Sequence, residues 1–263
     1  SNFIKNLMKD KKQSNNSNYW SDPNLNILIP MAGAGSRFKE AGYIFPKPLI
    51  EIDNKPMIQW VIESLKLEGN YIFIVQKEHQ EKYNINSVLK ILKPNCKIIE
   101  LDHITEGAAC TTLLAKKFIN TNNPLIIANS DQYIKWDSIK SMYNYNQKKI
   151  DGSILTFEAI HPKWSYAKTD KNSFVTEVAE KKVISKNATV GVYYWKKGSD
   201  YVNCAETMIK KNVRVNNEFY VCPVYNEAIG EGKKIIIDKV SEMHGLGTPD
   251  DLKNFITKKN LTN

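Results

Sequence analysis

Short, continuous runs of apolar residues alternate with amphipathic stretches over the first half of the chain. Four of these runs predict β-strands, at 26–30, 71–75, 97–101 and 124–129. Continuous apolar strands that are joined by amphipathic helices are typical of βαβ units. The pattern therefore predicts a parallel sheet that is covered by helices on both faces.

Two segments of this half have the apolar spacing of helices. A helix over 55–69 would place five residues on one buried stripe: Met57, Trp60, Val61, Ser64 and Leu65. It reaches a glycine, Gly69, where we expect it to end. A second helix is expected to begin near Glu106 and to continue to Lys117.

The pattern changes after Asp151. Four segments there read as strands that are separated by turns, at 151–159, 164–170, 173–180 and 188–197. Three helices are expected among the later residues, at 200–211, 223–230 and 249–258. The fold class that follows is α/β, with a doubly wound, mainly parallel sheet and a mixed β extension.

The first 24 residues differ from the rest of the chain. They contain four lysines, a cluster of Asn and Ser, and few apolar anchors. We expect residues 1–24 to form a loose tail with a helical turn at 3–8. Residues 25–263 are expected to form one domain with two parts, 25–150 and 151–263.

The charge balance is basic, with 37 Lys and Arg against 28 Asp and Glu, a net charge of +9. Such a balance is compatible with nucleic acid or with a small anionic substrate. The lysines are interleaved with acids and form no run of five, so we expect no nucleic-acid partner. No apolar run approaches the roughly 20 residues of a membrane span, and the start lacks a secretory signal, so we expect a cytoplasmic protein without a membrane partner.

A glycine-rich turn follows the first predicted strand, in "NILIPMAGAGSRF". Ligands of doubly wound sheets bind beyond the carboxyl ends of the strands, where glycines let backbone N–H groups approach phosphates. The turn is neither a P-loop nor a complete dinucleotide fingerprint. Two cations accompany it, Arg37 and, in "FPKPLIEI", Lys47. A guanidinium and an ammonium beside a glycine turn predict a polyphosphate site.

The residues "PMAGAGSRF" and "PKPLIEIDNKPMIQWVIE" resemble the signature of the nucleotidyltransferase (nucleotidyl diphospho-sugar pyrophosphorylase) family. Its members transfer NMP from an NTP to a sugar 1-phosphate or a similar phosphorylated acceptor. The similarity continues through "TEGAACTTLLA", "NSDQY", "VAEKK", "VGVYYW", "NEFYVCPVYN" and "GLGTPDDL", and covers about residues 25–257. It implies a Rossmann-like fold in which 25–150 binds the nucleotide and 151–263 binds the acceptor.

The resemblance also implies roles for individual residues. Arg37 would hold the leaving β- and γ-phosphates, Lys47 would bridge toward the α-phosphate, and Asp131 would bind Mg²⁺ or Mn²⁺. The nucleotide would contact residues of three segments: Ala32, Gly33, Ala34, Gly35 and Ser36; Glu106 and Gly107; Asn129 and Ser130. The acceptor would contact four residues, with Lys181 on its phosphate: Glu180, Lys181, Gly191 and Glu218.

One departure concerns the metal. Many family members carry a second metal-binding aspartate in a Trp-x-Asp-x-Gly-Thr stretch, and "MHGLGT" places Gly245 there. His244 is a poor substitute because magnesium prefers oxygen ligands. Either Asp131, phosphates and waters suffice, or another acid such as Asp238 or Glu242 serves.

Several functions stay open on these residues. The leading hypothesis is NMP transfer from an NTP, with CTP or UTP favoured, to make a precursor of a surface or capsular polysaccharide. The acceptor would be a sugar 1-phosphate or, for a cytidylyltransferase, a non-sugar phosphate such as phosphocholine. A catalytically silent nucleotide-binding regulator is a second hypothesis, although such a protein should have lost the charges of the phosphate turn. A glycosyltransferase is a third, but "NSDQ" lacks its Asp-x-Asp motif. A homo-oligomer is compatible with each.

Overall fold

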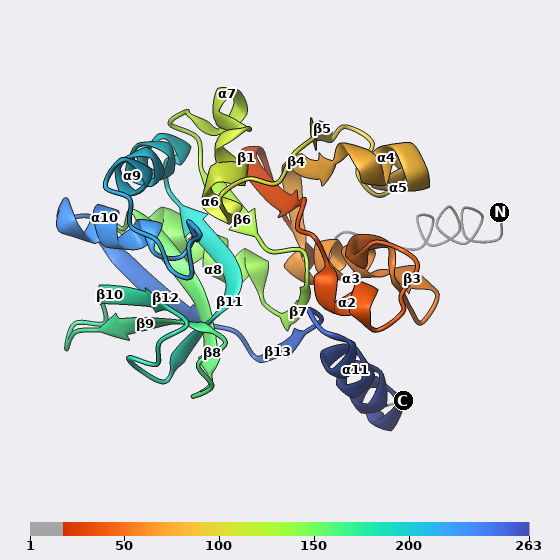
Figure 1. Ribbon diagram of the computed structural model, residues 1–263. Coiled ribbons are helices and arrows are strands. Elements are labelled where there is room, and N and C mark those ends of the chain that lie inside the picture. The colour runs from red at the N-terminus through yellow and green to blue at the C-terminus, as the bar shows by residue number, and fades with distance from the viewer. Residues whose placement is uncertain (1–17, 263) are drawn as a thin grey trace.

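Strand β1 (Trp20–Met31) lies inside a nine-stranded sheet in the computed structural model, which describes residues 18–262 (Figure 1). It pairs in parallel with β6 (Leu125–Ala128) on one side and with β4 (Leu67–Gln76) on the other. Strand β5 (Lys97–Leu101) continues the parallel order beyond β4. These four strands contain or match the four apolar runs of the first half, so the predicted parallel sheet is confirmed.

Five further strands extend the sheet beyond β6: β11 (Asn187–Trp195), β8 (Gly152–Glu158), β9 (Ser165–Thr169), β10 (Val175–Glu180) and β12 (Ile235–Lys239). Strand β11 runs antiparallel to β6 and also to β8 and β9. Strand β12 joins β8 in parallel. The expected mixed extension is therefore present, and it continues the same sheet.

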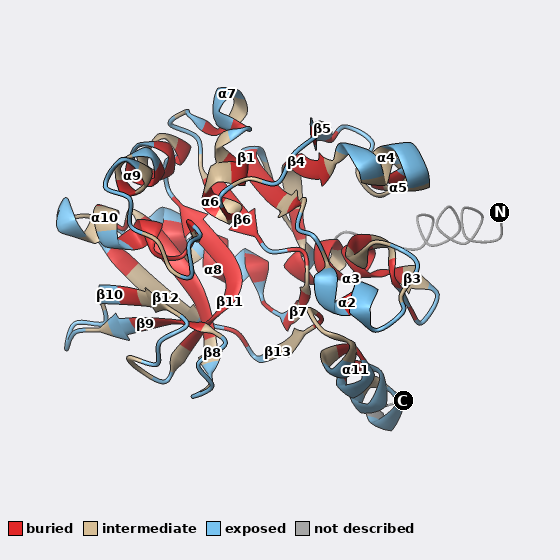
Figure 2. Ribbon diagram, viewed as in Figure 1, coloured by how far each residue is buried: buried red, intermediate tan, exposed pale blue. Residues whose placement is uncertain are grey.

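Helices cover both faces of the sheet, and the alternation along β1 shows why. Ile27 and Ile29 belong to the buried cluster on one face, whereas Leu28 belongs to the cluster on the other. The first face packs against α3 (Met57–Leu65), α5 (Ile85–Leu92) and α8 (Ser138–Gln147). The second face packs against α6 (Ala108–Leu113), α7 (Lys116–Ile119), α9 (Gly198–Lys210) and α10 (Val224–Gly230). Figure 2 shows this buried interior.

A third, smaller cluster joins residues from the two ends of the described chain. Helix α2 (Ser36–Glu40), which follows the glycine turn, buries Phe38 in it. Helix α11 (Pro249–Thr262) contributes Leu252 and Phe255. Helix α11 of the second predicted part, 151–263, therefore packs on the first part, 25–150, and the functional division between them stays a prediction.

The remaining elements surround this cluster or flank the sheet. They are the 3-10 turn Lys47–Leu49, the hairpin of β2 (Glu51–Ile52) and β3 (Lys55–Pro56), helix α4 (Lys77–Tyr83), and the antiparallel pair of β7 (Gln132–Lys135) and β13 (Glu242–Gly245). Among residues 18–262, no helix is long and apolar enough to span a membrane.

Strand β1 begins earlier than the sequence predicts. Residues 20–24, which were expected in the loose tail, belong to β1, and the Trp20 backbone N–H donates to the Lys66 carbonyl at 3.1 Å. Trp20 also stands opposite Leu67 in the ladder to β4. The predicted helical turn at 3–8 and the rest of the tail lie outside the described residues.

Two helix boundaries also differ from the prediction. Helix α3 ends at Leu65 because Lys66 adopts the left-handed conformation, and Gly69 lies within β4 instead. All five residues of its predicted stripe are buried, so the face was predicted correctly. The helix expected from Glu106 to Lys117 is divided into α6 and α7.

Candidate functional site

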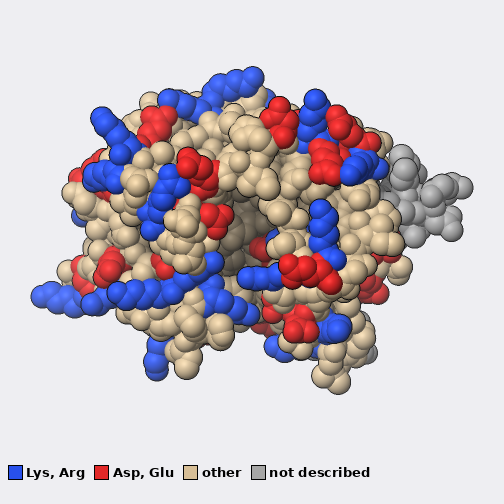
Figure 3. Space-filling model, in the orientation of Figure 1, with Lys and Arg blue, Asp and Glu red and all other residues tan. Residues whose placement is uncertain are grey.

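A cleft of about 620 Å³ opens at the carboxyl ends of the central strands. Figure 3 shows the hollow, with lysine, arginine and acidic side chains around it. Eleven of the site residues that were predicted from the sequence line this cleft: Gly33, Ala34, Gly35, Ser36, Arg37, Lys47, Asn129, Asp131, Glu180, Lys181 and Gly191. The fold therefore brings the glycine turn, both predicted cations and the predicted metal ligand together.

The end of strand β4 fixes the glycine turn through hydrogen bonds. Gln76, the last residue of β4, donates from Nε2 to the carbonyls of Ala32 (3.0 Å) and Gly33 (2.7 Å). Gly35 has φ of 61°, a conformation that glycine adopts without strain. Gly33 is different, because a Cβ there would meet no atom within 4 Å and its φ is not positive. Protein packing therefore does not require a glycine at Gly33, whereas close approach of a ligand would.

The two predicted cations are arranged differently. The Lys47 Nζ lies 3.0 Å from Asp131 Oδ2, and the two side chains are 23% and 32% exposed. Arg37 is exposed and has no ion-pair partner within residues 18–262. Asp131 follows β6, and its carbonyl accepts from the Leu246 N–H at 2.7 Å. One cation is thus free to meet an anion, and the other neutralises the predicted metal ligand.

Asn129 and Ser130 connect β6 to Asp131. The Asn129 N–H donates to the Gly191 carbonyl at 2.8 Å, which ties the end of β6 to β11. Both of these residues line the cleft, whereas Ser130 is buried and does not. Ser130 is therefore placed beside the cleft without being part of its wall.

Three of the four predicted acceptor residues line the cleft: Glu180, Lys181 and Gly191. Burial raises the pKa of Glu180 to about 7, the Glu218 carboxylate also raises it, and the neighbouring Lys181 opposes the shift. The Lys181 Nζ lies 5.1 Å from the centre of the Tyr220 ring. The Tyr220 hydroxyl donates to Glu218 Oε2 at 2.9 Å. Glu218 does not line the cleft but reaches it through Tyr220, which does.

Three buried residues with hydroxyl groups also belong to this cleft, and the sequence did not reveal them. The hydroxyls of Thr189 and Tyr193 lie 3.1 Å apart, Ser165 lies 3.4 Å from Tyr193, and Ser165 also bonds Thr189. All three residues line the cleft. They come from β9 and β11, which are separate in sequence, so only the pairing of these strands brings them together.

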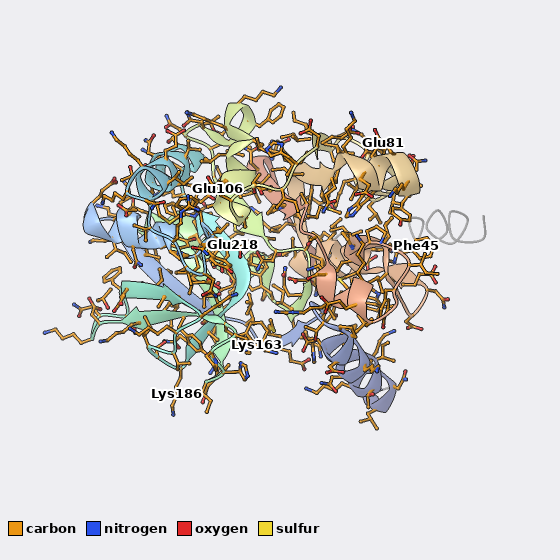
Figure 4. The ribbon with its side chains drawn as sticks, viewed as in Figure 1. Phe45, Glu81, Glu106, Lys163, Lys186 and Glu218 are labelled. Carbon is orange, nitrogen blue, oxygen red and sulfur yellow. The ribbon has the colours of Figure 1, made fainter. Side chains whose placement is uncertain are left out.

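Glu106 and Gly107, which were predicted to contact the nucleotide, do not line the cleft, although the next residue, Ala108, does. Glu106 Oε1 accepts from Arg214 Nη2 at 2.8 Å, and the Glu106 carbonyl accepts from the Phe219 N–H at 2.9 Å. Gly107 has φ of 130°, and a Cβ there would lie 2.5 Å from the Phe219 carbonyl oxygen. Figure 4 shows Glu106 and Glu218 on the same half of the molecule. The loop of Glu106 and the loop of Glu218 are therefore joined through Phe219.

The acids that the sequence offered in place of Gly245 do not line the cleft. Asp238 accepts from Ser141 and Tyr145, and Glu242 pairs with Lys135 at 3.0 Å. Each of these two acids therefore has its partners outside the cleft.

The cleft contains other charged residues that the sequence did not single out. Lys163 and Asp251 both line it, with Lys163 Nζ 3.7 Å from Asp251 Oδ1. Figure 4 labels Lys163 between the β8–β9 region and α11. The sequence contained a weak indication that Asp251 lies in the first turn of a helix, because Thr248 and Asp251 have the spacing of a helix N-cap pair. The Asp251 N–H does donate to Thr248 Oγ1 at 3.2 Å.

Comparison with known proteins agrees with this geometry. The bifunctional protein GlmU of Thermosipho melanesiensis is 29% identical over 134 residues, which cover 50% of this chain and 28% of that protein. The mannose-1-phosphate guanyltransferase of Aspergillus oryzae is 26% identical over 142 residues, which cover 52% and 39%. The chain thus spans well under two thirds of these curated relatives.

A solved structure covers more of the chain. The nucleoside-diphosphate-sugar pyrophosphorylase of Vibrio cholerae RC9 is 25% identical, with a TM-score of 0.74, over 88% of this chain and 99% of that one. This likeness confirms the α/β fold with its central parallel strands. The nucleotidyl transferase family matches residues 27–238, and we conclude that the chain belongs to this family.

Proposed function

We propose that this protein transfers a nucleoside monophosphate from an NTP to a small phosphorylated acceptor and releases pyrophosphate. The observation that carries the proposal is the convergence of an open glycine turn, Arg37, Lys47 and Asp131 on one cleft in a chain of this family. Lys181 and Glu180 line the same cleft. A donor and an acceptor would therefore meet within one enclosed space.

The reaction needs positioning and charge stabilisation more than acid–base chemistry. A phosphate oxygen of the acceptor attacks the α-phosphorus of the NTP, the bond from the α-phosphorus to the bridging oxygen breaks, and pyrophosphate leaves with the electron pair. No general base is needed, because the attacking phosphate is already ionised. Arg37 would hold the leaving phosphates, and Lys47 would stabilise charge at the α-phosphate. Lys181 would hold the acceptor phosphate.

The donor atoms of the cleft fit a magnesium or manganese ion. Among the described residues, no group of three or more His, Cys, Asp or Glu side chains could hold a metal. Mg²⁺ needs fewer protein ligands, because it takes one or two carboxylates and completes its shell with phosphate oxygens and waters. Asp131 would provide a carboxylate, which already faces the Lys47 ammonium at 3.0 Å. When bound, the ion would neutralise charge on the phosphates.

For the substrates, we propose CTP or UTP as the donor and a sugar 1-phosphate as the acceptor, for a surface or capsular polysaccharide. The segment 105–112, "TEGAACTT", differs from the Gln-x-x-x-x-Gly pattern that is frequent in the hexose-type enzymes. The buried hydroxyls of Ser165, Thr189 and Tyr193 would bond a polyhydroxylated acceptor.

A second candidate is a non-sugar phosphate with a cationic end, such as phosphocholine. The observation that favours it is the Tyr220 ring, which already lies 5.1 Å from an ammonium group, beside Glu218 and Glu180. An aromatic face with nearby carboxylates is a suitable site for a cationic group.

Pyrophosphate release separates these candidates. Each of the four common NTPs is incubated with Mg²⁺ and with either a sugar 1-phosphate or phosphocholine. Release should depend on the acceptor, and Arg37→Ala should lower kcat by roughly 10²–10³. Lys39→Ala is the matched control, because Lys39 is exposed on the same helix and does not line the cleft. Release without an acceptor, or equal effects of the two substitutions, would contradict the proposal.

A further inference from the structure

Besides Asp131 and Glu180, the cleft has a further carboxylate to which neither the glycine-turn motif nor the family resemblance gives a role. We propose that Asp251, in the first turn of α11, is the second metal-binding acid of the cleft and replaces the side chain that Gly245 lacks. This proposal rests on the proposed function, because it concerns the ion that accompanies the NTP.

Asp251 reaches the space that an acid at position 245 would use. Its Oδ2 atom lies 3.5 Å from the place where a Cβ of residue 245 would be. The φ of Gly245 is not positive, so the backbone there does not require glycine. A carboxylate oxygen from α11 therefore lies in van der Waals contact with the place where the side chain of the family aspartate would begin.

Asp131 lies against the same short segment of chain. Its carbonyl accepts from the Leu246 N–H at 2.7 Å, and its Oδ2 atom lies 2.9 Å from the Cβ position of Gly247. Asp251 thus faces the Cβ position of residue 245, and Asp131 faces that of residue 247. Two carboxylates beside one short segment, both lining the cleft, give the oxygen donors that Mg²⁺ prefers.

Each of these carboxylates is paired with a lysine of the cleft. Lys47 Nζ lies 3.0 Å from Asp131, and Lys163 Nζ lies 3.7 Å from Asp251. In the ligand-free protein, the two lysine ammonium groups therefore provide the positive charge that a bound metal ion would provide beside these carboxylates. The phosphates of an NTP attract both lysines, which leaves the two carboxylates available to the ion.

Asp251 is positioned by packing that does not depend on the ion. Its neighbour Leu252 and Phe255, one turn further, are buried in the cluster that contains Phe38 and Trp60. The Asp251 side chain is 22% exposed, whereas Asp250 is exposed and does not line the cleft. Asp250 has the same charge and lies on the same helical turn, so it provides a matched control.

Manganese binding tests the proposal without relying on turnover. Free Mn²⁺ is measured by electron paramagnetic resonance while the ion is titrated into protein with a CTP or UTP analogue whose α,β-bridging oxygen is a methylene. Asp251→Asn should weaken Mn²⁺ binding by roughly tenfold or more, because one anionic ligand is lost. Asp250→Asn should stay within about twofold. If both variants titrate alike, the proposal is overturned.

A rescue variant distinguishes ligation from a structural effect. Asp251→Ala should lose affinity, and adding Gly245→Asp should restore most of it, since residue 245 faces the same space. The melting temperatures without metal should agree, because the partly exposed Lys163–Asp251 pair stabilises little. Absence of rescue together with a lowered melting temperature would overturn the proposal. If the wild-type protein binds no Mn²⁺ with either analogue, the proposed function itself fails.

Discussion

Replacing Glu180 by Gln should change how the stability of this protein depends on pH. The ordinary pKa of the carboxyl is 4.5, and burial raises it to about 7, with a further contribution from Glu218. Below the ordinary value, the carboxyl is protonated in both the folded and the unfolded state. Above about pH 7, the folded state must hold an ionised carboxylate that burial disfavours. The stabilising protonation is thus lost as the pH rises through the folded pKa.

The magnitude follows from these two values. At 1.36 kcal/mol for each pH unit between them, ionised Glu180 destabilises the fold by roughly 3 kcal/mol at most. Between about pH 5 and about pH 8, the free energy of unfolding of the wild type should fall by roughly 2–3 kcal/mol relative to Glu180→Gln. Other titrating groups are common to both proteins, so the difference isolates this carboxyl.

Urea unfolding at a series of pH values measures the effect. Glu177→Gln is the control, because Glu177 lies on the same strand with its side chain in solvent, and its profile should parallel the wild type. A free-energy difference between Glu180→Gln and wild type that does not vary with pH would refute the reasoning. It would mean that the Glu180 carboxylate is as well solvated in the fold as in the unfolded chain.

Two glycine substitutions should affect different properties, one the stability of the fold and the other the binding of NTP. Gly107→Ala places a Cβ 2.5 Å from the Phe219 carbonyl oxygen at φ of 130°. Urea unfolding should therefore show that the free energy of unfolding falls by about 2 kcal/mol or more. A fall of less than about 0.5 kcal/mol would contradict this packing. Gly33→Ala meets open space, so the free energy of unfolding should stay within about 0.5 kcal/mol of wild type. Calorimetry should nevertheless show weaker NTP binding for Gly33→Ala, and unchanged binding would refute a close phosphate contact at this turn.

The sequence predicted the strands well because their signal is local. Continuous apolar runs such as 71–75 need no knowledge of their partners to be read as buried strands. The end of α3 was misplaced because Lys66, a residue without a preference for the left-handed conformation, ends the helix. A glycine three residues later, Gly69, was the stronger local signal and was misleading.

The candidate site was predicted where one motif supplied all of the residues. Arg37 and Lys47 follow the same glycine turn, so their convergence could be inferred. Asp251 could not be found in this way, because its relation to Asp131 depends on the pairing of β7 with β13 and on the packing of α11. These contacts join distant parts of the chain, and periodicity contains no information about them.

The cluster around Phe38 has a consequence for the order in which the protein can mature. The glycine turn is synthesised early, but Leu246, Leu252 and Phe255, which belong to the same buried cluster as Phe38, are synthesised after the rest of the described fold. A nascent chain that has released only the parallel strands contains Phe38 and early members of the cluster such as Met57, but it lacks the three late residues. Nucleotide affinity should therefore be acquired late on the ribosome, when α11 emerges and docks.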